Sequence, residues 1–455
     1  MAEIVNNGGY FLSRAGRSKY QFYVIGLIIF LLLLNGYPKF IFKEKYHIPW
    51  LTDVRQVQPL ECYPVNLSTV SQHWPYFDQK TLSLSISNAH KNNENQVNLK
   101  KDSLSLTIVI VTAKPEFHRL PLTLVALLIH LDPLHIKEVM FLVPPRDIEL
   151  LKPLILTSAS IWPWPITFIS DDILLKHVHT DSYRLQMMFK LVVAQIIVTE
   201  FYLILDSDCV AVWPIHVEHL LWKTKNGNLN TPAVRALYQY EERDDRKLWW
   251  PASESVLQVK SNTCTSSSPS SPTIGVTPAI LSRSIALRAL CRLQYLYGHQ
   301  HYLIRLANWK LINLIWGSMW TEYTIYFLTS ECTQTFHTNH FHMAPSMPPL
   351  NLYGLSVYYS TDWHSFNRNQ LREIVKTGLK WRQKEFEFGS SIIDYSQKRS
   401  LFTVLQGRQY INPILFHKLL YPLYIEHLKL RNSTSTIVEQ TINLLDNMVK
   451  QLIKS

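Results

Sequence analysis

Cysteine is scarce in this chain, and the few cysteines are scattered. The 455 residues include five of them, namely Cys62, Cys209, Cys264, Cys291 and Cys332. This number and spacing exclude a small scaffold built from disulfides, although one or two bridges could form in an oxidising compartment. Cys209 follows two aspartates at the end of an apolar run, and we expect it to be a small buried residue beside them.

Charged residues are also few. They make up 17% of the chain against 47% hydrophobic residues, which excludes a wholly disordered protein. The net charge is +11, but no single basic block carries it. The charge therefore fits anionic substrates or a membrane surface, and no nucleic-acid partner is expected. The length leaves room for one large domain or two ordinary ones.

The N-terminal segment has no acidic residue between Glu3 and an apolar run at residues 20–37, and it carries three basic residues. The run lies at the short end of the lengths that span a membrane. By the positive-inside rule, residues 1–19 are cytosolic and the rest is lumenal, as in a single-pass type II protein. No small-x-small cleavage site follows Leu34, so an uncleaved anchor is favoured over a signal peptide. A short span suits the Golgi or the endoplasmic reticulum.

Residues 38–103 are polar and lack clear periodicity, which is typical of a stem between an anchor and a folded domain. Asn66 and Asn432 each begin an Asn-x-Ser/Thr sequon, which can be glycosylated only in the lumen. Such triplets also arise often by chance, so they add little to the predicted topology.

Strands and helices alternate from residue 104 onward. Strands are predicted at residues 104–112, 138–143 and 166–169, with helices at residues 118–130 and 148–156 between them. This alternation predicts an α/β domain with a doubly wound, mainly parallel sheet. A further helix at residues 182–198, capped by Asp181, leads into the next strand.

That next strand organises the chain, because its apolar run, Phe201–Leu205, ends in two aspartates. Asp206 and Asp208 stand at the carboxyl end of a predicted buried strand, where open α/β sheets bind ligands. Two carboxylates at positions i and i+2 can reach one hard cation, Mn²⁺ or Mg²⁺, and leave positions open for phosphate oxygens.

Three interpretations of Asp206-Ser207-Asp208 compete. It can be the D-x-D element of a nucleotide-sugar glycosyltransferase, the D-x-D-x-V nucleophile loop of an aspartyl-phosphate phosphatase, or a strand end that caps a turn. The nucleophile strand of such a phosphatase normally opens the fold. Here residues 104–205 of the predicted domain come first, and so does the acidic pair Asp171-Asp172. The phosphatase is therefore disfavoured.

Four segments together resemble a known family. They read Y-R-L-Q-M-M-F-K-L at residues 183–191, L-D-S-D at 205–208, I-G-V-T-P at 274–278 and W-T-E-Y at 320–323. Following an anchor and a stem, this order resembles the poorly characterised glycosyltransferase-like proteins that share Y-R-x-Q-x-x-x-K-L, L-D-[AS]-D and W-[ST]-E-Y segments and are assigned to the Rossmann-like GT-A fold. The resemblance covers residues 104–410 and leaves residues 411–455 as a C-terminal helical segment.

The resemblance implies a nucleotide-sugar donor, UDP- or GDP-linked, and an acceptor hydroxyl on a glycan, protein or lipid. It also implies Mn²⁺ or Mg²⁺ on Asp206 and Asp208. The residues expected near the donor are Arg184, Gln186, Lys190, Asp206, Gly275 and Thr277. An inactive, membrane-anchored protein that binds glycans or nucleotide sugars remains the alternative.

Glu322 is the candidate catalytic base. Thr321 can cap a helix that begins at Glu322, which places the carboxylate in the first turn. GT-A enzymes often carry a catalytic carboxylate at such a position, and an inverting transferase needs a base for the acceptor proton. Alternatively, Glu322 only complements the helix dipole.

Histidines and tryptophans supply weaker candidates. His342 and His364 could each add a late ligand to the metal, as GT-A folds commonly do. The histidines at 337, 340 and 342 lack a standard zinc spacing. Trp249-Trp250-Pro251 could be an exposed loop that stacks on a sugar, or it could pack in the core. Residues 261–272 are rich in Ser and Pro and predict a mobile loop.

Overall fold

All residues described by the computed structural model lie in one compact unit, Arg55–Ser455. They are residues 62–64, 75–77, 104–156, 163–170, 174–175, 178, 180–212, 214–223, 234–242, 249–259, 264, 272–274, 277–299, 301–309, 319–341, 350–353, 399–404, 413–430, 443, 446–447 and 450. The predicted anchor at residues 20–37, most of the stem, and both sequons at Asn66 and Asn432 lie outside this set. Within the set, no helix has the length and apolarity needed to cross a membrane.

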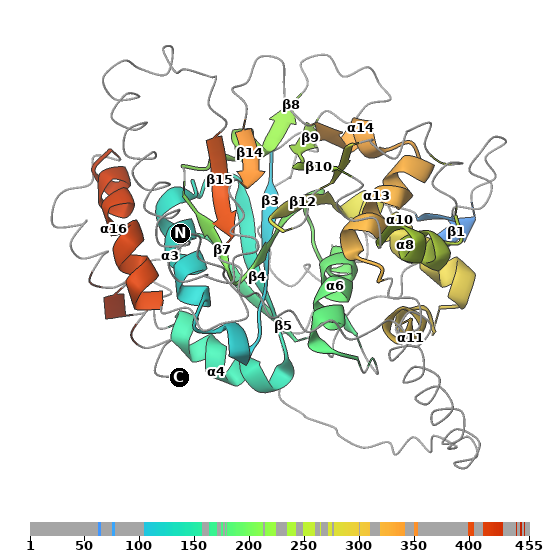
Figure 1. Cartoon of the computed structure of the whole chain (residues 1–455), viewed down its shortest axis with the longest axis horizontal. Coiled ribbons are helices and arrows are strands. Elements are labelled where there is room, and N and C mark those ends of the chain that lie inside the picture. Colours follow the sequence, from blue (N-terminus) through green and yellow to red (C-terminus); the bar gives the residue numbers. More distant parts are fainter. Residues whose placement is uncertain are drawn as a thin grey trace, which may run out of the picture. The chain divides into compact units, whose positions relative to one another are not determined.

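The centre of the fold is a five-stranded sheet in the order β12-β6-β3-β4-β5 (Figure 1). Strands β3 (Leu106–Val111), β4 (Ile136–Val143), β5 (Ile166–Ser170) and β6 (Phe201–Asp206) are parallel, and β12 (Ala279–Ser282) joins β6 antiparallel. The predicted α/β class and mainly parallel sheet are confirmed. The antiparallel edge strand β12 was not predicted. It is only four residues long and directly follows a strand-to-turn segment, so it does not stand out in the sequence.

Both faces of the sheet are buried, which explains the nearly continuous apolar strands. Successive side chains of a strand point to opposite faces. In β3, Leu106, Ile108 and Ile110 enter one hydrophobic core, and Val109 and Val111 enter the other. The sheet is therefore the middle layer between two layers of helices.

The helices divide between the two cores in the way Figure 1 shows. The first core contains α3 (Leu120–His130), α4 (Pro145–Leu156) and α16 (Pro413–Leu430); the second contains α6 (Ser182–Val192), α8 (Trp249–Leu257), α10 (Arg283–Tyr297), α11 (Tyr302–Asn308) and α13 (Glu322–Cys332). The predicted helix at residues 182–198 is shorter than expected. It ends at Val192 and passes into the 3-10 turn η3 (Val193–Gln195), where β-branched residues crowd a helical backbone.

Smaller sheets flank the central one. They contain β14 (Leu350–Tyr353), β15 (Arg399–Val404) and β7 (Cys209–Ala211); β13 (His340–Phe341), β9 (Val234–Leu237) and β8 (Leu221–Lys223); β10 (Tyr240–Glu242) and β11 (Pro272–Ile274); and β1 (Cys62–Pro64) and β2 (Pro75–Phe77). Short helical segments are η1 (Lys114–Glu116), α7 (Val217–Leu220) and α14 (Phe336–Asn339). Because β7 starts at Cys209 and pairs with β15, the two aspartates lie at the tight turn between β6 and β7.

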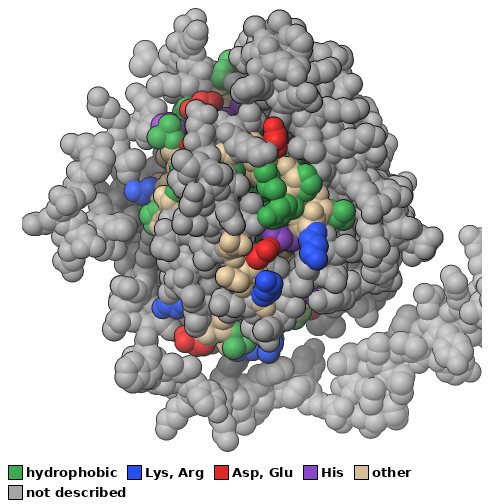
Figure 2. Space-filling model, turned by 90° about the vertical axis from the view of Figure 1, so that its left-hand side faces the viewer, with side chains coloured by type: hydrophobic (Ala, Val, Ile, Leu, Met, Phe, Trp, Pro, Cys, Tyr) green, Lys and Arg blue, Asp and Glu red, His purple; other side chains and the backbone are tan. Residues whose placement is uncertain are grey.

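The side of the molecule at the left of Figure 1 faces the viewer in Figure 2. Its coloured side chains are of mixed kind, with acidic, basic, histidine and hydrophobic groups interspersed. The described part of this face therefore carries no patch of a single charge sign.

Two disulfides join four of the five cysteines. Cys62 in β1 is bonded to Cys291 in α10, and Cys264 is bonded to Cys332 at the end of α13. Cys209 is free and buried, as predicted. One or two bridges were expected, but their pairing depends on which cysteines the fold brings together.

The exposed-loop interpretation of Trp249-Trp250-Pro251 is wrong. These residues form the first turn of α8. A proline is tolerated there, because the backbone N–H groups of a first turn have no partner within the helix. Trp250 is buried and packs edge-on against Phe327 of α13, with ring centroids 5.6 Å apart. The core alternative is correct for Trp250.

His340 is buried in β13, where its Nε2 lies 2.7 Å from the Tyr326 hydroxyl. Burial lowers the pKa of His340 from 6.5 to about 3. Among the described residues, no three His, Cys, Asp or Glu side chains are grouped as a set of metal ligands. His342 lies outside the described residues.

The buried His340 predicts a loss of stability in acid. Below pH 6.5 His340 becomes protonated in the unfolded chain, whereas in the folded protein it stays neutral down to about pH 3. The free energy of unfolding therefore falls as the pH decreases from 6.5 to 3. The slope is about 1.4 kcal/mol per pH unit. Urea unfolding should therefore show the stability advantage of the wild type over His340→Gln shrinking by about 2 kcal/mol between pH 7.5 and 5. The exposed His301 at the start of α11 supplies the control variant, His301→Gln, which is unfolded in urea at the same pH values. Equal slopes for wild type and His340→Gln would contradict the prediction.

Candidate active site

The strand order reverses between β3 and β6. The chain runs from β3 outward to β4 and β5, then returns to place β6 on the other side of β3. Val111 at the end of β3 pairs with Asp206 at the end of β6, so the segments that follow these strands meet at one edge of the sheet. Open α/β sheets bind ligands at such a switch point. The aspartates thus lie where the sequence predicted, at the carboxyl end of a buried strand.

Lys190 of α6 reaches Asp206 across this edge. Its Nζ lies 3.0 Å from Asp206 Oδ1 and 3.3 Å from Oδ2, so the ammonium contacts both carboxylate oxygens. The Lys190 side chain is 6% exposed and that of Asp206 is 34% exposed. Burial alone would lower the pKa of Lys190, but the neighbouring Asp206, Tyr323 and Glu322 raise it well above its usual value. The ammonium is therefore held in its charged form.

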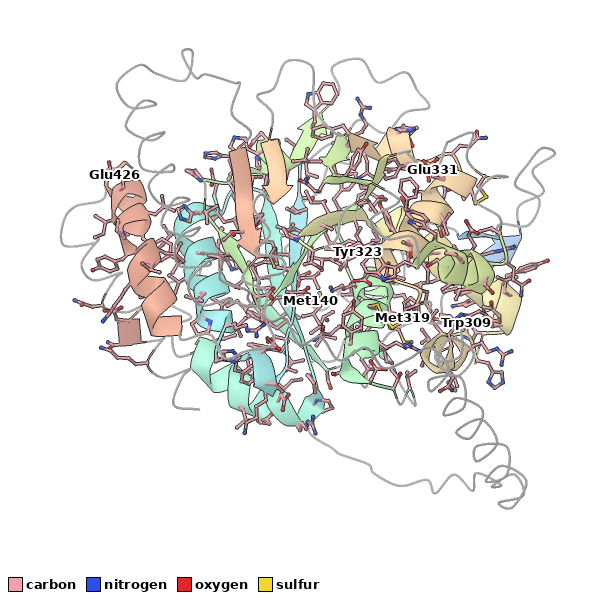
Figure 3. All side chains as sticks on the ribbon, in the orientation of Figure 1. Met140, Trp309, Met319, Tyr323, Glu331 and Glu426 are labelled. Atoms are coloured by element: carbon pink, nitrogen blue, oxygen red, sulfur yellow. A yellow bond between two sulfur atoms is a disulfide. The ribbon has the colours of Figure 1, made fainter. Side chains whose placement is uncertain are left out.

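The turn before β12 supplies a second partner for Lys190. Its Nζ donates to Thr277 Oγ1 at 2.9 Å, and the Thr277 hydroxyl lies 2.5 Å from the hydroxyl of Tyr323 in α13. Tyr323 lies near the start of α13, labelled in Figure 3, and its ring centroid is 5.6 Å from Lys190 Nζ. Tyr202 in β6 donates its hydroxyl to the Lys190 carbonyl at 3.0 Å. These contacts fix α6 relative to the strand that carries the aspartates.

Glu322 is the third partner. It begins α13, which Thr321 caps by accepting the backbone N–H of Thr324 at 3.2 Å, as the sequence predicted. Its Oε1 lies 3.2 Å from Lys190 Nζ, and its side chain is only 3% exposed. Burial raises the pKa of Glu322, and the charge of Lys190 opposes that rise. The structure thus joins Glu322 to Asp206 through one ammonium group.

The segment after β3 reaches the second aspartate. Arg119 Nη1 lies 3.7 Å from Asp208 Oδ2 and 3.2 Å from Glu116 Oε2, and Ser207 Oγ lies 3.5 Å from the same Glu116 oxygen. Thr123 of α3 donates to the Ser207 carbonyl at 2.8 Å, which holds the turn. The sequence interpretation missed Glu116 and Arg119. Their only signal was their place directly after the first strand of a doubly wound sheet.

Asp208 lies in a place that disfavours its charged form. Burial and the neighbouring Asp206 raise its pKa to about 7, although Arg119 opposes this rise. Around the turn, the carboxylates of Asp206, Asp208, Glu116 and Glu322 face the two cations Lys190 and Arg119. Among the described residues, four carboxylates therefore share two cations, and this excess of acidic groups suits a bound cation.

The other predicted site residues are placed differently. Arg184 is 1% exposed, and its Nη1 donates to the Ala307 carbonyl of α11 at 2.9 Å. Gln186 is half-buried on α6. Gly275, His342 and His364 lie outside the described residues. The structure therefore brings together Lys190, Asp206, Thr277 and Glu322, and not Arg184.

Three of the solved structures that resemble this chain serve as examples. They are the mouse xyloside xylosyltransferase 1 (10% identity, TM-score 0.33, covering 67% of this chain and 98% of that one), the bifunctional glycosyltransferase WbbM (10%, 0.34, 76% and 52%) and the glycosyltransferase GlyE of Streptococcus pneumoniae TIGR4 (9%, 0.31, 71% and 62%). The chain thus spans about half of WbbM and under two thirds of GlyE. Such identities and TM-scores are too low to assign a fold family or an activity.

No relative was found among curated proteins. A family described as a family of unknown function (DUF6492) matches residues 103–374. This range contains the whole central sheet and every residue of the site built around Asp206 and Asp208. Because the match covers more than half of the 455 residues, the chain belongs to this family, DUF6492.

Proposed function

We propose that the protein is a metal-dependent glycosyltransferase that transfers a sugar from a nucleotide-sugar donor to an acceptor hydroxyl. The observation that carries this proposal is the pair Asp206 and Asp208 at the switch point of the sheet, in a cluster where four described carboxylates share two cations. A diphosphate-linked donor needs a divalent cation beside such carboxylates, because its own phosphates are anionic and would be repelled.

The residues present fit Mn²⁺ or Mg²⁺. Both are hard cations that take oxygen ligands, and Mg²⁺ is usually bound by one or two carboxylates together with water and substrate phosphates. Asp206 and Asp208 would hold the ion, which would stabilise the charge of the leaving diphosphate. His342 and His364 remain proposed as further ligands.

Several residues of the chain would serve the donor. Asp206 is exposed enough to meet it, whereas Arg119 lies beside Asp208 on the segment after β3 and offers a cation at the same edge. Gln186 and Gly275 remain proposed neighbours of the donor. Arg184 is not retained in that role, because its guanidinium holds the Ala307 carbonyl in the buried contact between α6 and α11.

We further propose that residues 20–37 anchor this domain in the Golgi membrane with residues 38–455 in the lumen. Two disulfides support a lumenal domain, because disulfides persist in oxidising compartments and are rare in the cytosol. Asn66 and Asn432 would then be accessible to glycosylation. The acceptor would be a glycan, protein or lipid that passes through the same compartment.

Donor hydrolysis tests the proposal. The purified protein is incubated with a panel of UDP- and GDP-sugars, with Mn²⁺ or with chelator, and release of the nucleotide is measured. We expect release from one donor that depends on the metal. If no donor is hydrolysed but one donor stabilises the protein against heat, the protein is a nucleotide-sugar-binding protein and not an enzyme. If no donor is hydrolysed and none stabilises the protein, the proposal is overturned.

A further inference from the structure

The buried pair of Lys190 and Glu322 has a role that follows from its contacts. We infer that it is a positioning pair that sets the charge and orientation of Asp206, rather than a donor ligand and a catalytic base. This inference rests on the proposed function, because it concerns how the proposed metal ligand is held.

Lys190 has no hydrogen-bond donor left for a phosphate. An ammonium group carries three N–H donors and no acceptor. Within 3.3 Å of Lys190 Nζ lie Asp206 at 3.0 Å, Thr277 Oγ1 at 2.9 Å and Glu322 Oε1 at 3.2 Å. Three donors meet three protein acceptors. A donor phosphate could bind Lys190 only by displacing one of them.

Burial orders the three charges from the interior to the surface. The side chains are 3% exposed for Glu322, 6% for Lys190 and 34% for Asp206. A general base must come within about 2.6–3.2 Å of the proton that it removes. Glu322 is buried and already paired with Lys190. Of the three charged residues, Asp206 is therefore the one that can contact ligands.

The signs of the three charges explain the role of Glu322 beside Lys190 and Asp206. Lys190 alone would neutralise Asp206 and compete with a cation for both of its oxygens. The carboxylate of Glu322, on the buried side of the ammonium, gives the three residues a net charge of one negative. It also attracts Lys190 away from Asp206. Buried partners of this kind orient metal ligands and tune their affinity. Glu322 therefore acts on the metal site through Lys190.

Mn²⁺ binding tests this inference without turnover. Free Mn²⁺ is followed by electron paramagnetic resonance during titration of the full chain, with circular dichroism to confirm folding. Glu322→Gln keeps the size of the side chain and removes its charge, so Lys190 shifts toward Asp206. We expect the dissociation constant for Mn²⁺ to rise by about 10–100-fold. The double variant Lys190→Met/Glu322→Gln removes both charges and should return it to within about threefold of wild type.

Glu331 supplies the matched control. It lies nine residues after Glu322 in the same helix, toward the other end of α13 (Figure 3), and is half-buried. Glu331→Gln should bind Mn²⁺ like the wild type. It also shows whether loss of any carboxylate from α13 is enough to weaken binding.

The possible results separate the inference from the proposed function. If Glu322→Gln binds Mn²⁺ like the wild type but cannot transfer sugar, Glu322 is the base and the inference is wrong. If the double variant binds as weakly as Glu322→Gln, the effect does not pass through Lys190 and the inference is also wrong. If the wild type binds no Mn²⁺, the proposed function fails and the inference falls with it.

Discussion

Replacing Asp208 by Asn should abolish metal-dependent activity while it stabilises the metal-free fold. The substitution keeps the shape of the side chain and removes one of the two carboxylates proposed to hold the cation. Metal ions contribute several kcal/mol of transition-state stabilisation, so we expect kcat/KM for the donor to fall by at least about 100-fold. Thermal stabilisation by Mn²⁺ should be lost as well.

The opposite effect on stability follows from burial. Asp208 is 9% exposed, and Asp206 and Glu116 lie in the same cluster with it. Removing a negative charge from this place relieves repulsion and desolvation when no cation is bound. In chelator, Asp208→Asn should therefore be more stable than the wild type, on the order of 1–2 kcal/mol, as in other trade-offs between stability and activity.

Two measurements check this prediction, namely donor hydrolysis with Mn²⁺ and thermal unfolding with chelator and with Mn²⁺. Glu149→Gln is the control, because Glu149 is an exposed carboxylate on α4 outside the site. It should change neither quantity. Unchanged activity of Asp208→Asn would remove Asp208 from the metal site, and lower stability in chelator would show that its charge is compensated in the fold.

Of the single variants named here, Lys190→Met should lower the free energy of unfolding most. The substitution fits the space but leaves Glu322 buried without a countercharge and removes the hydrogen bond to Thr277. Breaking a buried ion pair on one side costs about 3–5 kcal/mol, because the remaining charge has lost both water and its partner. Adding Glu322→Gln removes that stranded charge and should recover most of the loss.

Urea unfolding of the two single variants and the double variant measures this coupling as a double-mutant cycle. Lys152→Met is the control, because Lys152 is exposed on α4, and its effect should stay within about 0.5 kcal/mol. Additive effects of Lys190→Met and Glu322→Gln would mean that the two charges do not stabilise each other. That result would contradict the ion pair seen at 3.2 Å.

Local pattern was enough for the main elements of the fold. Strand β6 is an apolar run that ends at Asp206, and both features are visible in the chain. Thr321 predicted the start of α13 because a cap acts on the backbone three residues away. Helix α8 was missed because two tryptophans before a proline look alike in a loop and in a buried first turn, and only the packing of Trp250 on Phe327 separates the two.

The sequence by itself determined that this protein has an α/β domain with two aspartates at the end of a buried strand, because strand period, caps and acidic spacing are local properties. Only the tertiary structure decided what meets those aspartates. It brought Arg119 to Asp208 across 89 positions of the chain, and Glu322 to Lys190 across 132 positions, while it turned Arg184 toward Ala307. These contacts depend on strand order and on how helices pack across the sheet, and no spacing along the chain encodes a distance between charges in space.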